Sequence, residues 1–263
     1  MLEKSGNGSI WNYGSGNLLI KMEIITDFNQ IDLNSLEEFI YNHPHGNFFQ
    51  STNAFKFFQS VDNYEPILLV AKEKDEIVGS LLAVVMKEKG LKGYFSRRCI
   101  VWGGPLVKDD HPEIVNALLQ KLNENVLNKA IYTEFRNLFD MSAIKEVFKE
   151  NKFVFLDHLN FIIEIVNLDE NFKNLNENRK RQIKKAIKNN VEISIPKDKN
   201  EVKEFFVILK KLYKEKVNKP LPNFNFFEKF FFSNNLGKYF LVKSNGNIIG
   251  GIMCPIFKDT IYE

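Results

Sequence analysis

The sequence predicts an α/β fold of the α+β kind, made of two similar halves. The chain has 263 residues and an apolar fraction of 44%, enough for more than one hydrophobic core. In each half, two segments with helical spacing of apolar residues precede two adjacent strand-like segments. ILLVAKEKDEIVGSLLAVV (67–85) and YFLVKSNGNIIGGIMCPIF (239–257) share one pattern of strand, lysine, polar turn and long strand. A repeat of about 170 residues indicates a duplicated domain.

Each element of the first half follows from local periodicity and turn chemistry. Residues 111–126, for example, place Ile114, Leu118 and Leu122 on one helical face. The polar turn 73–76 joins two apolar runs into a hairpin. In chain order we expect a strand at 22–25, helices at 34–41 and 52–61, strands at 66–72, 77–87 and 94–101, the helix 111–126, a strand at 130–135, a helix at 141–151, and paired strands at 153–156 and 160–166.

The second half begins with a predicted helix at 172–190, which Asn174 and Glu177 cap as a capping box. We then expect a strand at 191–195, helices at 201–217 and 224–232, a hairpin of 239–243 with 248–257, and a strand from 260. These elements predict a first domain over 22–168 and a second domain over 169–263 that is cut short after its central hairpin. Residues 1–21 are rich in Gly, Ser and Asn, so we expect a disordered or non-native extension.

Composition excludes several classes of protein. The net charge is only +3, from 36 basic and 33 acidic residues, whereas broad binding of duplex DNA requires a larger excess of cations. The two cysteines and four histidines show no ligand spacing, so no metal site is predicted. No run of 18 apolar residues is present, so no transmembrane helix is expected.

The segment NRKRQIKKAIKNN (178–190) concentrates positive charge on one predicted helix. At about 100° per residue, Ile183, Ala186 and Ile187 form an apolar stripe, and most of the cations lie on the other side. Arg179 falls within the stripe, near the helix N-terminus. A buried guanidinium needs an anionic or carbonyl partner. Either it binds a phosphate, or it pairs with a carboxylate of the other domain.

Two further segments carry glycines that have both a structural and a functional explanation. In VWGGPLV (101–107), Trp102, Gly103 and Gly104 form either a wall of the substrate cleft or a tight turn at a strand end. In the second half, Gly250 and Gly251 lie within a strand, which indicates either close approach of a ligand or a β-bulge.

A helix pair followed by an antiparallel hairpin resembles the first half of the GNAT acyltransferase fold. Two such units joined near a basic helix are similar to the FemAB-type aminoacyltransferases of cell-wall synthesis. The segments that carry this resemblance are GNFFQST (46–52), RRCIVWGGPLV (97–107), NRKRQIKKAIKNNVEI (178–193) and NIIGGIMCPIFKDTIYE (247–263). The resemblance implies tandem GNAT-like domains, each a mixed and mostly antiparallel sheet flanked by helices.

The same resemblance implies a cytoplasmic bacterial enzyme. It would transfer an aminoacyl or acyl group to an amine of a peptidoglycan or surface-polysaccharide precursor that carries phosphate. The donor would be aminoacyl-tRNA or acyl-CoA, with no permanently bound cofactor, and a peripheral position at the membrane face stays open. Phe49 and Gln50 would border the cleft, and Tyr213 and Tyr262 would line it. By their own pattern, Phe49 and Gln50 equally fit a hydrophobic staple beside Ser51 or Thr52 as a helix cap. Arg179 would bind a substrate phosphate, with Lys180 as a flanking donor. A loop at 102–112 that carries Asp109 and Asp110 would repel phosphate, so the first domain is not expected to hold CoA.

No nucleophile–base pair is evident, which agrees with acyl transfer achieved through positioning and stabilisation of an oxyanion. By the resemblance, the groups that assist the carbonyl oxygen lie beyond Glu263, so the chain by itself is expected to be impaired and its catalytic residues stay unassigned. Two other readings remain: a nucleic-acid-binding module that uses the basic helix, and a non-catalytic GNAT-fold binding protein. A DNA-reading helix would carry Asn, Gln or Ser on its basic face, whereas this face is nearly all lysine.

Overall fold

We describe the chain from a computed structural model, which covers residues 3–4, 10–13, 20–87, 96–233 and 235–263. The chain divides into two compact units, Met1–Asp157 and His158–Glu263. This division lies eleven residues before the domain boundary expected from the sequence (158 against 169).

Unit 1 contains an eight-stranded sheet among the described residues, in the order β1-β2-β3-β4-β5-β6-β8, with β7 paired to β5. All its pairings are antiparallel except that of β6 with β8. The elements are β1 (Glu3–Lys4), β2 (Ile10–Tyr13), β3 (Ile20–Ile25), α1 (Leu33–Asn42), α2 (Thr52–Ser60), β4 (Tyr64–Glu73), β5 (Glu76–Met86), β6 (Arg98–Trp102), β7 (Leu106–Val107), α4 (Pro112–Val126), β8 (Tyr132–Arg136) and α5 (Lys145–Glu150).

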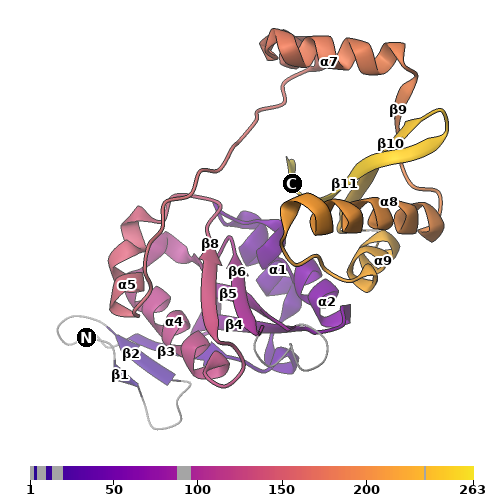
Figure 1. Cartoon of the computed structure of the whole chain (residues 1–263). Helices are drawn as coiled ribbons and strands as arrows, with labels where there is room; N and C mark the ends of the chain where they lie inside the picture. Colours follow the sequence, from indigo (N-terminus) through magenta and orange to yellow (C-terminus); the bar gives the residue numbers. More distant parts are fainter. Residues whose placement is uncertain (1–2, 5–9, 14–19, 88–95, 234) are drawn as a thin grey trace. The chain divides into compact units, whose positions relative to one another are not determined.

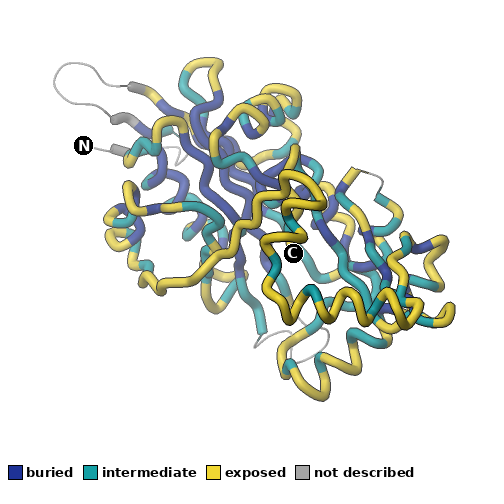
Figure 2. Tube along the Cα trace, turned by 90° about the horizontal axis from the view of Figure 1, so that it is seen from above, coloured by how far each residue is buried: buried dark blue, intermediate teal, exposed yellow. Residues whose placement is uncertain are grey.

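Helices cover both faces of this sheet, as Figure 1 shows, with α1 and α2 on one face and α4 and α5 on the other. The main core joins β3, β4 and β5 to Ile114, Leu118 and Leu122 of α4. Burial on both faces explains why β5 is apolar over nearly its whole length and does not alternate. Figure 2 shows these central strands as buried.

A strand lies where the sequence indicated a disordered extension. Ile10–Tyr13 pairs with β3, with Trp11 opposite Met22. Trp11 is 2% exposed and belongs to the main core. The disorder expected for 1–21 is therefore absent at β2, where Trp11 supplies enough apolar surface to fix an otherwise polar segment.

Unit 2 contains a four-stranded antiparallel sheet among its described residues, in the order β12-β11-β10-β9. Helices α8 and α9 pack on it, and Phe205, Phe227 and Tyr239 form the centre of its core. The elements are α6 (Leu168–Asn174), α7 (Glu177–Lys188), β9 (Val191–Ser194), α8 (Lys199–Leu212), the π-helical turn η5 (Tyr213–Val217), α9 (Phe224–Phe232), β10 (Gly237–Ser244), β11 (Asn247–Phe257) and β12 (Thr260–Ile261).

The duplication expected from the sequence is present in the strand register. In unit 1, Ala71 pairs with Gly79 and Lys72 with Ile77, which leaves Val78 as a bulge. In unit 2, Val242 pairs with Gly250 and Lys243 with Ile248, so Ile249 is the bulged residue. The order β3-α1-α2-β4-β5 is repeated as β9-α8-α9-β10-β11. The repeat thus includes the position of the β-bulge, which the sequence pattern did not specify.

Three expectations about the middle of the chain are wrong. Residues 153–156 and 160–166 form no strands, because nothing among the described residues pairs with them. The single helix expected at 172–190 is two helices, which separate at Leu175–Asn176. The capping box of Asn174 and Glu177 is absent, since Asn176 caps α7 by accepting a hydrogen bond from the Arg179 N–H at 2.9 Å.

The strand expected at 94–101 begins at Arg98; residues 94 and 95 lie outside the described residues.

Candidate functional site

Gln50 joins three segments of unit 1 at a short 3₁₀ turn, η2 (Phe48–Gln50). Its Nε2 donates to the carbonyl oxygens of Leu82 at 3.1 Å and Trp102 at 2.8 Å. Its Oε1 accepts from the Leu82 N–H at 2.8 Å. Gln50 is 1% exposed, and Phe48 in the same turn is 3% exposed. A buried amide with all these partners fixes η2 against β5 and β6.

Trp102 stands in a column of stacked rings at the end of β6. Its ring is stacked on Phe49 at 6.0 Å and on Phe58 at 5.7 Å, and Phe58 is stacked in turn on Tyr64 at 6.0 Å. The Arg136 guanidinium carbon lies 6.0 Å from the Trp102 ring centre. Because Phe49 and Trp102 are only partly buried, this column offers a flat edge for a ring or an apolar chain.

The glycines after Trp102 are packed by protein side chains. A Cβ at Gly103 would lie 2.7 Å from Asn47 Nδ2, and a Cβ at Gly104 would lie 2.7 Å from the Gln50 amide. Gly103 also has φ of +60°, which glycine adopts most easily. The Asn47 Nδ2 donates to the Gly103 carbonyl oxygen at 2.7 Å. The described surroundings of these glycines therefore match a tight turn at the strand end.

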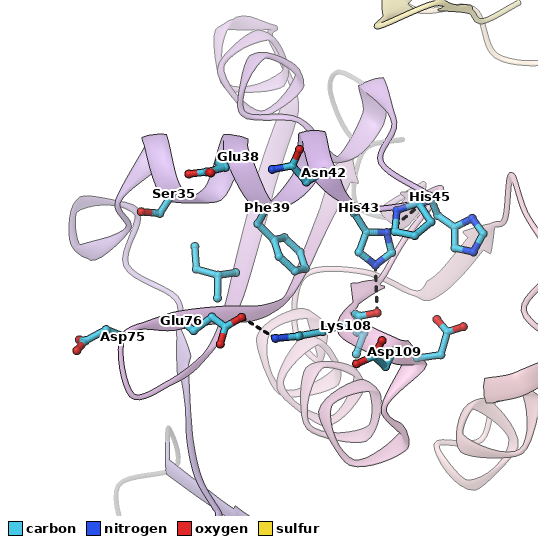
Figure 3. A pocket seen from close by; sticks show the side chains of 14 residues that line it. Ser35, Glu38, Phe39, Asn42, His43, His45, Asp75, Glu76, Lys108 and Asp109 are labelled. Carbon is cyan, nitrogen blue, oxygen red and sulfur yellow. Dashed lines mark hydrogen bonds and ion pairs between the residues drawn. The ribbon is translucent and has the colours of Figure 1, made fainter.

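A cavity of about 620 Å³ opens between α1 and the turn that joins β4 to β5 (Figure 3). Phe39, Ile77 and Val107 supply its apolar lining. Its lining also includes five carboxylates and a single lysine, Lys108, which forms an ion pair with Glu76 at 2.6 Å. The carboxylates belong to Glu38, Asp75, Glu76, Asp109 and Asp110. This excess of negative charge opposes a phosphate ligand.

His43 lines this cavity but is not placed to act as a base. Its Nδ1 accepts a hydrogen bond from the His45 N–H at 3.1 Å, so its Nε2 carries the proton and donates to the Val107 carbonyl oxygen at 3.1 Å. The ring is 8% exposed. Both nitrogens are therefore occupied, and His43 connects the end of α1 to β7.

Neither cysteine thiol of the chain is activated as a nucleophile. Burial raises the pKa of the Cys99 thiol to about 12, and it also raises the pKa of the Cys254 thiol. Burial likewise raises the pKa of the Tyr64 phenol to about 12, against a smaller opposite effect of Arg98. These groups are neutral near pH 7, so the described part of the site has binding and orienting groups to offer.

Arg179 is exposed, contrary to the buried position expected from the helical wheel. Its guanidinium Nη1 donates to Gln182 Oε1 at 3.0 Å. Lys180 forms an ion pair with Glu177 at 2.8 Å. The wheel placed Arg179 beside Ile183 and Ile187, but α7 has no fully buried residue, and both isoleucines are exposed.

The other candidates of unit 2 lie apart from α7 in the chain and differ in their surroundings. A Cβ at Gly251 would lie 2.8 Å from the Phe240 carbonyl oxygen and 3.2 Å from the Phe205 ring, whereas a Cβ at Gly250 would meet nothing within 4 Å. Tyr213 begins η5 and Tyr262 donates its N–H to the Pro255 carbonyl oxygen; both side chains are partly buried. The β-bulge considered for this strand is present at Ile249.

Sequence reasoning missed Arg136, Asn47 and His43. Arg136 reaches Trp102 because β6 and β8 pair in parallel, which places these residues in register. The Gly103 N–H also donates to the Arg136 carbonyl oxygen at 2.9 Å. No local pattern predicts a parallel pairing across a helix. The polar residues of NHPHGN did carry a signal, because a turn so rich in His and Asn indicates side chains that bond to backbone.

No protein-family model matches the sequence, and no curated protein sequence matches it. Among solved structures, the crystal structure of FemX matches 84% of this chain with a TM-score of 0.58 and 18% identity. The chain has the FemX fold. It spans 58% of the length of the FemX chain.

Two other solved structures align with just over half of this chain. They are a transcriptional regulator from Bacillus halodurans C-125, with 17% identity over 54% of this chain and 99% of its own, and a ribosomal-protein-alanine N-acetyltransferase from Brucella melitensis biovar Abortus 2308, with 13% identity over 54% and 98%. Their TM-scores are 0.40 and 0.38, below that of FemX. In this chain, the FemX fold comprises two GNAT-like mixed α/β units, and no helix among the described residues has the length and apolarity needed to cross a bilayer.

Proposed function

We propose that this chain belongs to an acyltransferase of the FemAB type, which transfers an aminoacyl or acyl group to an amine of a cell-envelope precursor. The observation that carries the proposal is the tandem unit: two hairpins with the same bulge, each preceded by two helices, in a chain with the FemX fold. The donor is aminoacyl-tRNA or acyl-CoA, and the acceptor carries phosphate.

The reaction requires little covalent chemistry from the protein itself. The acceptor amine attacks the acyl carbonyl carbon, the ester or thioester bond breaks, the amine loses a proton, and the departing hydroxyl or thiol gains one. Positioning and stabilisation of the oxyanion can provide most of the rate. Two observations support such a mechanism over covalent catalysis. The pKa values of the Cys99 and Cys254 thiols are raised, and both ring nitrogens of His43 are engaged in hydrogen bonds.

We assign the phosphate of the precursor to Arg179. Its guanidinium uses one N–H on Gln182, and the described residues give it no carboxylate. Its position in the first turn of α7 also places it near backbone N–H groups at the positive end of the helix. Lys180 flanks it, although Glu177 neutralises part of its charge. The ring column of Phe49 and Trp102 is assigned to an apolar or planar part of a substrate.

The proposal is tested on the full-length protein with aminoacyl-tRNA and acyl-CoA as donors and a UDP-linked muropeptide as acceptor. Arg179→Ala should weaken muropeptide binding about 10- to 100-fold, the loss typical of a hydrogen bond to a charged group. Lys188→Ala, the same loss of charge at the other end of α7, should change it less than about threefold. Equal effects would overturn the assignment of Arg179, and absence of transfer with both donors would overturn the enzymatic proposal.

A further inference from the structure

Helix α7 separates positive charge and apolar side chains onto adjoining faces. Its twelve residues include six Lys or Arg and one Glu. At about 100° per residue, Ile183, Ala186 and Ile187 share one face, and Lys184 and Lys188 begin the next. Ile183 is 37% exposed and Ile187 67% exposed. A helix with exposed cations beside exposed isoleucines is basic and amphipathic.

The segment that leads to α7 is also exposed, as Figure 2 shows, and its sequence is largely apolar. Its large side chains are between 61% and 90% exposed; they are Leu159, Phe161, Ile162, Ile163, Ile165 and Val166. Soluble monomers rarely expose a contiguous apolar stretch of this length, and such a stretch indicates an interaction surface for another molecule or a membrane. The two observations are independent, because one concerns charge on a helix and the other concerns an irregular segment.

We infer that α7 and residues 159–166 bind the surface of an anionic lipid bilayer, with α7 lying in the plane of the interface. A bilayer complements both faces of the helix: lipid phosphates attract the lysines, while Ile183 and Ile187 enter the acyl boundary. A nucleic acid would use the cations and leave the isoleucines in water. Residues 159–166 form no helix or strand, so their backbone stays hydrated at headgroup level and their side chains provide the contact.

This inference does not rest on the proposed function, and it uses neither Arg179 nor Lys180. Each cation near an anionic surface strengthens binding by roughly fivefold at physiological salt. Removing the three charges of Lys184, Lys185 and Lys188 should therefore weaken vesicle binding roughly a hundredfold. Polar replacement of Ile183 and Ile187 should weaken it by a similar order, because two side chains lose their burial.

The experiment measures cosedimentation of the full chain with vesicles of phosphatidylcholine, and with vesicles that also contain phosphatidylglycerol. The variants are Lys184→Gln/Lys185→Gln/Lys188→Gln and Ile183→Ser/Ile187→Ser. A matched control, Lys203→Gln/Lys210→Gln/Lys214→Gln, removes the same charge from exposed positions of α8 and η5. Circular dichroism checks that each variant is folded, which is expected because α7 buries no side chain.

We expect binding to the phosphatidylglycerol vesicles alone, a loss in both α7 variants, and no loss in the control. Equal binding to both vesicle types, or an unchanged isoleucine variant, would overturn the inference. Binding of a single-stranded oligonucleotide in place of vesicles, with the isoleucine variant unaffected, would identify a nucleic-acid helix. Self-association seen by light scattering, without vesicle binding, would show that a second copy of the chain binds this surface.

Discussion

Replacement of Gln50 by glutamate tests whether the buried amide holds η2 against the sheet. Glutamate has nearly the same shape, but its ionised carboxylate cannot donate to the carbonyl oxygens of Leu82 and Trp102. Each buried acceptor left without its donor costs about 1–3 kcal/mol, and a buried unpaired carboxylate adds to this cost. We therefore expect Gln50→Glu to lower the free energy of unfolding by about 4 kcal/mol near pH 7.

The loss should depend on pH in a definite direction. Burial and two facing carbonyl oxygens raise the pKa of the introduced carboxyl in the folded state above its unfolded value of about 4.3. The protonated carboxyl can donate one hydrogen bond again. The penalty should therefore be smallest below about pH 4 and should grow as the pH rises toward the folded-state pKa.

Tryptophan fluorescence during urea unfolding measures this effect in unit 1, because both tryptophans of the chain, Trp11 and Trp102, belong to that unit. The control is Gln59→Glu on the exposed side of α2, where the same chemical change should cost less than about 0.5 kcal/mol. A Gln50→Glu protein as stable as the parent, or a penalty that is the same at low and neutral pH, would refute the hydrogen-bond scheme.

Three further expectations concern stability. Trp11→Ala should lower the stability of unit 1 by about 3–5 kcal/mol, measured by circular dichroism, because Trp11 is 2% exposed; an unchanged melting temperature would contradict the placement of β2. Glu201→Gln should cost about 3 kcal/mol by stranding Lys243, 7% exposed and 2.6 Å away, unless Lys243→Met accompanies it. The hydrogen bond from Lys243 holds the pKa of Glu201 below its ordinary value. The stabilisation from this pair should therefore be present above about pH 4.3 and should be lost as the pH falls through the folded-state pKa of Glu201. Hydrogen exchange of the β10 amides measures this loss. Gly251→Ala should cost about 1–3 kcal/mol in thermal unfolding, while the adjacent Gly250→Ala should cost nothing, and equal costs would contradict the packing.

Much of the fold could be predicted from local sequence. The hairpins β4–β5 and β10–β11 were predictable because long apolar runs flank short polar turns. Ser51 caps α2 by accepting from the Ala54 N–H at 3.1 Å, and serine is a residue that sequence rules favour at this position. Residues 160–166 have the same apolar character as these strands, yet no described strand pairs with them. Composition predicts the tendency of a segment to form a strand, but pairing needs a partner that composition does not supply.

The site was only partly predictable for the same reason. Phe49, Gln50, Trp102, Gly103 and Gly104 do lie together, because η2 and the end of β6 meet through the Gln50 amide. Arg179 was placed correctly on the helical wheel and wrongly in the interior. A wheel gives the relative directions of side chains, whereas burial depends on what packs against the stripe, and no residue of α7 is fully buried by the described residues.

The two bulged hairpins have similar backbones but require glycine at different positions. Gly79 follows the bulge in unit 1, where a Cβ would lie 2.9 Å from Ile114 of α4, so packing requires glycine. Gly250 is its counterpart in unit 2, where a Cβ would meet nothing within 4 Å, and the packing constraint falls one residue later on Gly251. Since neither packing nor a positive φ calls for glycine at 250, the backbone of β11 is open to close approach by a ligand at this position.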